Sequence, residues 1–502
     1  MTKLAKAGTR LAEFHVAGAI IALSFAIIAS AAAPNARERE EVYPFAMCSN
    51  GNILRNREYA EKLLDAGAIM ARTDFPFTAV RKEPGDDPDK WDWTVFEQAR
   101  AIKQAYPRLE WLGLLGYGAL WAEDPIYKDR PGEKWTAPQR GINVRPVDDP
   151  KNLYGHWVYE SVRRYGDIIK YWESWNEPDL GPAFFKGTPV EFFAYQRTFY
   201  LAAKKADPEC KVLFAGICYP SSEGYLKVHG LKPPTPHPPE LCFFEEYLKE
   251  CLKDPEAQKN NYYFDIMNTH TYSRATDTYN YVAIQRKLMQ DYLKQGDKPV
   301  WITEMGITDK GGMFGCSEDE YCDYMLQSFA WGSLAGVSRF FHFQLDNSNG
   351  HGLYDGMLGN PKPALKTYRD VLVKEFAGTK FSAQLHGSKG AEFLEGKSPF
   401  TGGGQDGYDL FEFRGPGKDR RVLMVFADTK APVTIKVPAE KKEATLIDRH
   451  NNRKKIQAGN GSYTVELSGA TNIGGWPTHE ELRSLGNPEH LIGGATVVIV
   501  EE

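Results

Sequence analysis

From residue 41 to residue 378, short apolar runs alternate with longer amphipathic stretches. Eight of the runs are nearly continuous in apolar residues, as parallel strands covered on both faces of a sheet require. They span residues 42–47, 69–75, 109–118, 169–177, 211–218, 264–272, 299–306 and 339–347. The pattern therefore predicts eight parallel strands.

Each predicted strand is followed by a stretch whose apolar residues recur at helical spacing. These stretches span residues 58–68, 93–106, 154–166, 189–206, 239–254, 281–295, 318–336 and 362–376. Eight strand–helix units over roughly 330 residues predict an α/β fold, the (β/α)8 TIM barrel with loop insertions. The alternative for such units is a doubly wound open sheet, but no glycine-rich phosphate loop follows the first predicted strand.

After Gly378 the pattern changes to short alternating runs separated by Gly, Asn, Asp and Lys. Such runs predict a small antiparallel β-sandwich over residues 379–502. The runs span residues 408–415, 420–428, 431–438, 443–450, 462–469 and 495–502. Because the last run reaches the C-terminus, we expect this domain to dock on the barrel. A structural role and a sugar-binding role are both open for it.

Two further segments stand apart from these elements. Residues 1–33 begin with Lys3, Lys6 and Arg10 and continue into an apolar run that ends in alanines. This pattern predicts a secretory signal peptide cleaved near residues 31–33, with an uncleaved anchor helix as the alternative. The proline-rich "HGLKPPTPHPPE", residues 229–240, predicts a loop at the barrel rim.

Composition adds little to this organisation. The chain of 502 residues is 42% hydrophobic and 25% charged, which is an ordinary globular balance. A net charge of −5 and the absence of a basic stripe argue against nucleic acid or an anionic membrane as a partner. Eleven Trp and 26 Tyr supply many flat rings on which sugars could stack, although protein cores use the same residues.

Seven cysteines are scattered along the chain without a CxxC pair, so no zinc-knuckle spacing is present. Cys316 with Cys322, or Cys242 with Cys251, could form a local disulfide after export. An odd count leaves at least one thiol free, and no bridge is predicted. We expect no metal or organic cofactor.

Polar side chains gather at the carboxyl ends of the predicted strands, where a TIM barrel places its active site. They are Arg72, Asn176, Glu177, His270, Tyr272 and Glu304. Two facing carboxylates are what glycosidic bond cleavage needs, one protonated to assist the leaving oxygen and one ionised to attack. Each residue also has a structural interpretation: Glu177 as a helix-start carboxylate, Glu304 and Arg72 as a barrel ion pair, and His270 as a core histidine.

The motifs "SWNEPD", "NTHTY" and "VWITEMG" resemble those of the retaining glycoside hydrolases of clan A. The interval from residue 177 to residue 304 is 127 residues, about three βα units, as strands four and seven require. The resemblance implies that Glu177 is the acid/base and Glu304 the nucleophile. It also implies that Asn176 contacts the sugar 2-hydroxyl, while Tyr272 and Arg72 support the nucleophile.

Other features distinguish among the families of this clan. A barrel followed by a β-sandwich, and the segment of residues 74–93, look more like family 39 and its relatives than family 5. Many family 5 members carry a His after strand three, whereas this chain has "GLLGYGALW" there, with Tyr117 and Trp121. They also often carry a Trp after strand eight, whereas this chain has "FHFQLDN". Trp121 and Gln344 are candidate sugar contacts, with packing as the alternative.

The sequence thus predicts an exported, retaining glycoside hydrolase that cleaves β-glycosidic bonds of oligosaccharides or polysaccharides. Transglycosylation is an alternative within the class, because it uses the same motifs with a sugar in place of water. A carbohydrate-binding protein on a barrel without catalysis is the alternative from another class.

Overall fold

The computed structural model describes residues 43–49, 51–218, 242–310, 315–347, 349–387, 407–415, 419–472 and 492–502. The predicted signal peptide and the proline-rich insertion lie outside these ranges, so both stay predictions. Within the described ranges, no helix combines the length and the apolar character needed to cross a bilayer.

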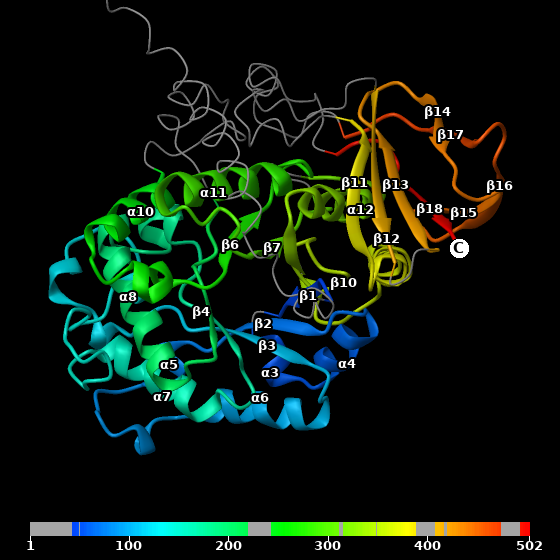
Figure 1. The fold of residues 1–502 in the computed structure, drawn as a ribbon. Coiled ribbons are helices and arrows are strands. Elements are labelled where there is room, and N and C mark those ends of the chain that lie inside the picture. The colour runs from blue at the N-terminus through cyan, green and yellow to red at the C-terminus, as the bar shows by residue number, and fades with distance from the viewer. Residues whose placement is uncertain are drawn as a thin grey trace, which may run out of the picture. The chain divides into compact units, whose positions relative to one another are not determined.

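Eight parallel strands form the first sheet (Figure 1). They are β1 (Phe45–Cys48), β2 (Met70–Asp74), β3 (Glu110–Leu114), β4 (Tyr171–Glu173), β5 (Lys211–Leu213), β6 (Met267–Thr271), β7 (Val300–Met305) and β8 (Val337–His342). Consecutive strands pair from β1 to β5 and from β6 to β8, and β8 pairs with β1. Parallel bridges of Leu213 with Ile266 and of Ile217 with Thr269 join β5 to β6. The predicted (β/α)8 barrel is confirmed.

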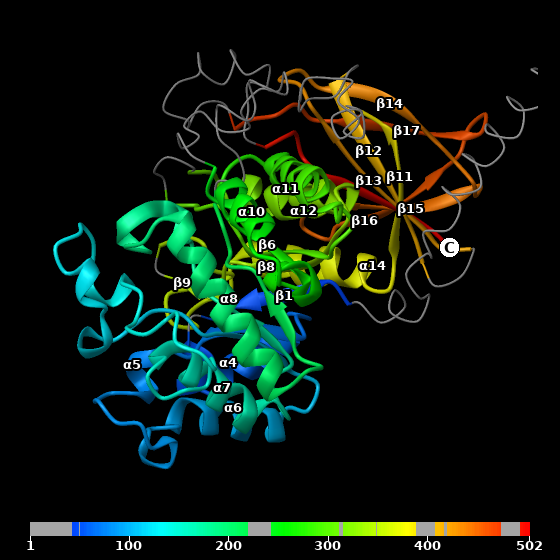
Figure 2. The ribbon, with the colours of Figure 1, turned by 60° about the vertical axis from the view of Figure 1, so that its left-hand side comes forward.

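Helices follow the strands and lie outside the barrel (Figures 1 and 2). They are α3 (Asn52–Arg55), α4 (Glu58–Asp65), α5 (Phe77–Val80), α6 (Thr94–Ala105), α7 (Leu153–Tyr165), α8 (Pro189–Ala206), α10 (Phe243–Lys253), α11 (Asp277–Leu293), α12 (Glu318–Leu334), α13 (Pro363–Lys366) and α14 (Lys374–Phe376). A π-helical segment, Thr367–Val373, joins α13 to α14. Capping boxes start two of the helices, Thr188 with Glu191 at α8 and Ser317 with Glu320 at α12, and satisfy backbone N–H groups there.

Side chains alternate between the inside of the barrel and the helices outside it. The inner cluster consists of Ala46, Cys48, Met70, Leu112, Leu213, Ile266, Trp301 and Phe341. The intervening residues, such as Met47, Ala71 and Trp111, belong to the larger core under the helices. Because both faces of every strand are buried, the strands read as continuous apolar runs in the sequence. Polar side chains gather at the carboxyl ends, while near the amino end of β8 the buried Arg339 packs over Trp301.

The C-terminal region forms an antiparallel β-sandwich, as predicted. Its strands are β11 (Lys380–His386), β12 (Tyr408–Arg414), β13 (Arg421–Ala427), β14 (Val433–Pro438), β15 (Glu443–Asp448), β16 (Arg453–Gln457), β17 (Ser462–Leu467) and β18 (Val497–Glu501). Six of them form one sheet in the order β11-β12-β13-β18-β15-β16, and β14 pairs with β17. The sequence pattern missed β11 and β16, which are edge strands with few buried side chains.

The larger sheet of the sandwich is covered on both faces. Leu423 and Val425 of β13 face the small core shared with β14 and β17, while Val422 and Met424 belong to the core that includes the barrel helices. On that second face, Phe413 of β12 stacks on Phe329 of α12 with 5.5 Å between ring centroids. This contact packs the sandwich against the barrel, as the docking prediction requires.

A buried carboxylate strengthens this packing. Asp323 of α12 accepts hydrogen bonds from Arg449 Nη1 at 2.7 Å and from the backbone N–H of Thr496 at 2.8 Å. Gln327, one turn later, donates to the carbonyl of Gly494 at 2.9 Å. Polar groups of the sandwich therefore depend on two side chains of one barrel helix.

Replacing Asp323 by Ala is expected to lower the free energy of unfolding by about 2 kcal/mol, because it leaves the buried backbone N–H of Thr496 without its acceptor and Arg449 with only its exposed partner Asp319. Asp319→Ala is the matched control, since Asp319 binds the same arginine but its side chain is 52% exposed. The control is expected to cost less than about 1 kcal/mol. Denaturant unfolding measures both, and equal losses would contradict the assignment.

Candidate active site

Arg72 connects three strands at the carboxyl end of the barrel. Its guanidinium donates to both oxygens of Glu173 on β4, from Nε at 2.6 Å and from Nη2 at 2.9 Å. Nη1 donates to Glu304 Oε1 at 2.5 Å, and Nη2 also donates to Asn176 Oδ1 at 2.8 Å. The side chain is buried, so its geometry is fixed by these partners.

Glu173 is the fully buried counter-charge of Arg72. Besides the two arginine bonds, its Oε1 accepts from Asn268 Nδ2 at 2.9 Å and from the backbone N–H of Gly216 at 3.2 Å. A carboxylate oxygen that accepts several hydrogen bonds orients its donors. Glu173 therefore connects Arg72 to Asn268 on β6 and to the backbone of Gly216, which follows β5.

A chain of hydrogen bonds runs from Glu173 to His270. Because Asn268 donates to Glu173, its Oδ1 is the acceptor, and the Thr303 hydroxyl donates to it at 2.7 Å. The Thr303 oxygen can then only accept from His270 Nε2, 3.0 Å away. His270 thus carries a proton on Nε2, and its Nδ1 faces the barrel mouth.

Glu304 reaches the mouth because β7 contains a β-bulge. On β6, Thr269 pairs with Ile302 but the next residue, His270, pairs with Glu304, which leaves Thr303 as the extra residue. Both Thr303 and Glu304 therefore face the inside of the barrel. Glu304 Oε2 accepts a short hydrogen bond from the Tyr272 hydroxyl, while Oε1 accepts from Arg72. Two donors stabilise the ionised carboxylate.

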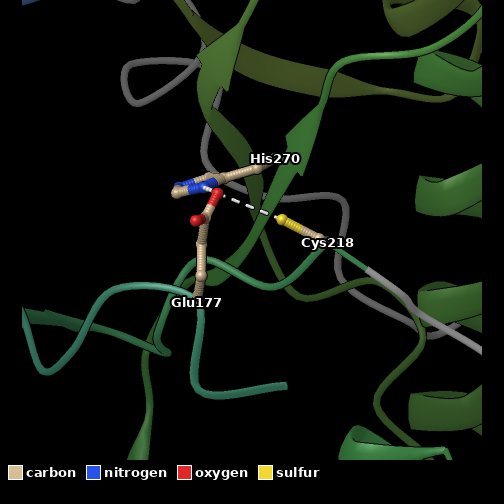
Figure 3. Close-up of side chains that lie close together, drawn as sticks. All are labelled: Glu177, Cys218 and His270. Atoms are coloured by element: carbon tan, nitrogen blue, oxygen red, sulfur yellow. Dashed lines mark hydrogen bonds and ion pairs between the residues drawn. The ribbon is translucent and has the colours of Figure 1, made fainter. Parts of the chain in front are cut away.

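The backbone conformation of Glu177 determines where its side chain points. Its φ of 49° and ψ of 49° lie in the left-handed region, which is uncommon for a residue with a side chain. The backbone N–H donates to the carbonyl of Gly216 at 2.9 Å and holds this conformation. The carboxylate then lies between His270 and Cys218, as Figure 3 shows, with Oε1 2.8 Å from His270 Nδ1 and 3.1 Å from the Cys218 sulfur, which donates to it.

Glu177 and His270 are coupled. Burial by itself would raise the pKa of Glu177, but the hydrogen bond and the charge of His270 outweigh it and hold the pKa below its usual range. Burial would lower the pKa of His270, yet the negative charges of Glu304 and Glu177 raise it. The two shifts together favour a charged imidazole beside an ionised Glu177.

His270 also sets the separation of the two mouth carboxylates. Its Nδ1 lies 2.8 Å from Glu177 Oε1 and 3.8 Å from Glu304 Oε2, so these oxygens are at most about 6.6 Å apart. Carboxyl groups about 5–5.5 Å apart are typical of retaining glycosidases, and wider pairs of inverting ones.

Two other predicted site residues, Asn176 and Gln344, lie at or beside the mouth of the barrel. Asn176 accepts from Arg72 and is hydrogen-bonded to Tyr117, so it belongs to the mouth network. Gln344 is buried beside the mouth: its Oε1 has no hydrogen-bond partner among the described residues, and the preceding Phe343 meets the Tyr272 ring edge-on at 5.5 Å. Its role in sugar binding stays a prediction.

Trp121 lies farther along the rim. Its indole N–H donates to the carbonyl of Arg81 at 3.1 Å, and the ring packs against Phe77 and the Arg81 guanidinium. The structure gives it a packing role, and its role as a sugar contact also stays a prediction.

Sequence reasoning missed three residues of the site. Glu173 lies two residues after Tyr171 in β4, so its side chain points into the barrel like that of Tyr171. This alternation was the only feature of the sequence that could have identified Glu173. Asp74 follows Arg72 by two residues and shares its face. Cys218 carries no motif, and only the fold brings it to Glu177. All seven cysteines are free, so neither possible local disulfide forms.

One group of side chains could hold a metal ion. Single donor atoms of Glu177, Cys218 and His270 all lie within 4.8 Å of one another.

Known proteins share this fold. A family profile described as the glycosyl hydrolase catalytic core matches residues 160–368. A family 39 glycoside hydrolase from the gut symbiont Bacteroides cellulosilyticus WH2 is 15% identical, covering 92% of this chain and 81% of its own, with a TM-score of 0.60. A GH39 β-xylosidase from Caulobacter crescentus is 14% identical over 92% and 96% of the two chains, with a TM-score of 0.55.

A GH30 endoxylanase from Clostridium papyrosolvens C71 is also similar, with 14% identity over 92% of this chain and 97% of its own and a TM-score of 0.52. A comparison with curated proteins found no match. At these identities the structural likeness shows a shared fold.

Replacing Gly216 by Ala is expected to displace His270, because a Cβ there would lie 2.0 Å from His270 Nε2. We expect a loss of about 1–3 kcal/mol in the free energy of unfolding, as for other overpacked sites. Gly116→Ala is the matched control, since its Cβ would meet nothing closer than 3.7 Å. Denaturant unfolding compares the two variants, and an unchanged Gly216→Ala protein would show that the imidazole has room to move.

Asp74 gives a prediction for pH dependence. Burial raises its pKa to about 6, because the charge of Arg72 only partly offsets the burial and the Glu304 carboxylate. The folded protein therefore binds more protons than the unfolded chain between about pH 4 and pH 6, and stability falls as pH rises through this window. Asp74→Asn should be more stable than the parent at pH 7.5, by up to about 2–3 kcal/mol, and similar at pH 4. Thermal unfolding at both values checks this, and a difference independent of pH would refute it.

Proposed function

We propose that this chain, which carries the catalytic core of a glycoside hydrolase on a clan A barrel, cleaves β-glycosidic bonds with retention of configuration. The observation that carries the proposal is the placement of Glu177 and Glu304 on either side of His270 Nδ1. Their nearest oxygens are close enough for a double displacement on one anomeric carbon. Glu304 would be the nucleophile and Glu177 the acid/base.

The two hydrogen-bond donors to Glu304 favour a role as the nucleophile. Arg72 and Tyr272 each donate to one of its oxygens, so the carboxylate is oriented before substrate binds. In the first step, Oε2 or Oε1 attacks the anomeric carbon while the bond to the leaving oxygen breaks. The leaving oxygen takes a proton from Glu177, and a glycosyl-enzyme ester remains on Glu304.

The pairing of Glu177 with His270 suits a residue that must both give and take a proton. Before the first step, the negative charge of Glu304 favours a proton on the pair. Once Glu304 is esterified that charge is gone, so Glu177 is more easily left ionised and can act as base on water. Water then attacks the anomeric carbon, gives its proton to Glu177 and releases Glu304.

The mouth also offers groups for sugar recognition. Asn176 is held by Arg72 in a position to bind a hydroxyl near the nucleophile. Gln344 Oε1 is a buried acceptor that a sugar hydroxyl could satisfy. Because similar structures include a β-xylosidase and an endoxylanase, we propose β-linked xylosides and related oligosaccharides as first substrates.

Export is part of the proposal. The N-terminal segment has the pattern of a signal peptide, and one similar structure is described as a conserved exported protein from Bacteroides fragilis. An exported hydrolase would meet polysaccharide fragments outside the cytoplasm.

The catalytic assignment is tested with Glu304→Ala and Glu177→Gln. Glu304→Ala should lose activity by on the order of 10⁴-fold or more on every substrate, because the nucleophile is gone. Glu177→Gln should lose about 10²–10⁴-fold on glycosides with poor leaving groups but far less on fluorides, which need no proton. Steady-state kinetics on both substrate types measure this, with Glu97→Gln on α6 as control.

Intact-protein mass spectrometry with 2-deoxy-2-fluoro glycosyl fluorides, starting with the xylosyl compound, tests the same proposal directly. We expect a mass increase of one sugar on the peptide that contains Glu304. Labelling of another carboxylate, or equal losses of Glu177→Gln on both substrate types, would overturn the roles.

A further inference from the structure

We propose that Glu177, Cys218 and His270 form a site for one thiophilic divalent cation of the zinc type, and that this cation and the glycosidase reaction exclude each other. The three donor atoms lie within 4.8 Å of one another. Figure 3 shows the carboxylate between the imidazole and the thiol. The residues lie at or just beyond the ends of β4, β5 and β6, three adjacent strand positions of the barrel.

The donor set suits zinc. Thiolate, imidazole nitrogen and carboxylate oxygen are its three common protein ligands, and three of them with one open position is the pattern of an accessible site. A tetrahedral ion with bonds of about 2.0–2.3 Å holds its ligands about 3.3–3.7 Å apart. Glu177 Oε1 is 2.8 Å from His270 Nδ1 and 3.1 Å from Cys218 Sγ, so these two separations need to widen by about half an ångström. His270 Nδ1 and Cys218 Sγ lie within 4.8 Å of each other, so they need to approach by no more than about 1.5 Å.

The surrounding hydrogen bonds prepare these donors. His270 Nε2 donates to Thr303, so the Nδ1 lone pair is the one directed at Glu177, and a metal-bound imidazole needs such a partner on its other nitrogen. The backbone of Glu177 is held by Gly216, and the N–H of Cys218 donates to Asp179 Oδ2 at 2.9 Å. The site is therefore built before any ion arrives.

The local charge also favours a cation. Glu177, Asp179 and Glu304 bring three carboxylates to this part of the mouth, while the guanidinium of Arg72 is already shared by Glu173 and Glu304. Cys218 is partly exposed, whereas Glu177 and His270 are buried, so an ion would approach from the side of the thiol.

Exclusion follows from the atoms that the ion would occupy. An ion bound to Glu177 Oε1 and His270 Nδ1 would lie between these two atoms and hold the carboxylate as a ligand, so Glu177 could not protonate the leaving oxygen. This half of the inference rests on the proposed function, whereas the binding half does not.

Binding is tested by titrating the full chain with CoCl2. We expect one equivalent to bind with the near-ultraviolet absorption of a cobalt–thiolate bond. Cys218→Ala should lose that absorption and weaken binding at least 10-fold, and Thr303→Val should weaken it about 10-fold, because the imidazole loses its partner. Cys316→Ala is the matched control, since Cys316 is also a partly exposed thiol, bonded to the carbonyl of Thr308. Absence of the thiolate band, or its loss in the control, would overturn the site.

Exclusion is tested with ZnCl2, comparing each variant with its own rate without metal. Zinc should inhibit the parent and Cys316→Ala with the same constant, EDTA should restore both, and Cys218→Ala should need at least about 10-fold more zinc. Zinc that binds at Cys218 without slowing hydrolysis, or that accelerates it, would overturn the exclusion. A chain that binds cobalt through Cys218 but hydrolyses no glycoside would uphold the site and refute the proposed function.

Discussion

The buried ion pair between Arg72 and Glu173 is the interaction on which the rest of the mouth depends. The two residues are 3% and 0% exposed, so removing either one would leave an uncompensated charge inside the barrel, a loss of about 3–5 kcal/mol. From the arginine the network extends to Glu304 and Asn176, and from the glutamate to Asn268, Thr303 and His270. Both carboxylates of the site are therefore connected to one buried pair.

The direction of this network decides the chemistry of Glu177. Because Asn268 donates to Glu173 and the Thr303 hydroxyl donates to Asn268, His270 Nε2 donates to Thr303 and Nδ1 faces Glu177. Under the proposed function this contact would serve acid/base catalysis, and a thiophilic cation would compete for the same atoms. One orientation of the imidazole thus accounts for its contact with Glu177 and for the donor geometry at Cys218.

Much of the fold follows from hydrophobic periodicity. The eight barrel strands are buried on both faces, and so is β13, which makes their signals strong. The edge strands β11 and β16 were missed because "KFSAQLH" and "RKKIQ" bury few side chains, and such strands carry charges and polar residues instead of an apolar pattern. Periodicity reports burial, and it fails where a strand is held mainly by backbone hydrogen bonds.

The sequence by itself determined the barrel and the sandwich and marked Glu177 and Glu304 as catalytic candidates, because burial and strand-end position leave a mark on local pattern. Only the tertiary structure decided how these residues point. Without the bulge at Thr303, strict alternation from Trp301 would turn Glu304 toward the helices, and without its left-handed backbone Glu177 would not meet His270. Glu173 and Cys218 acquire their roles from partners 101 and 41 residues away. Strand register and hydrogen bonds between distant residues decide these side-chain directions and partners, and a short stretch of sequence contains information on neither.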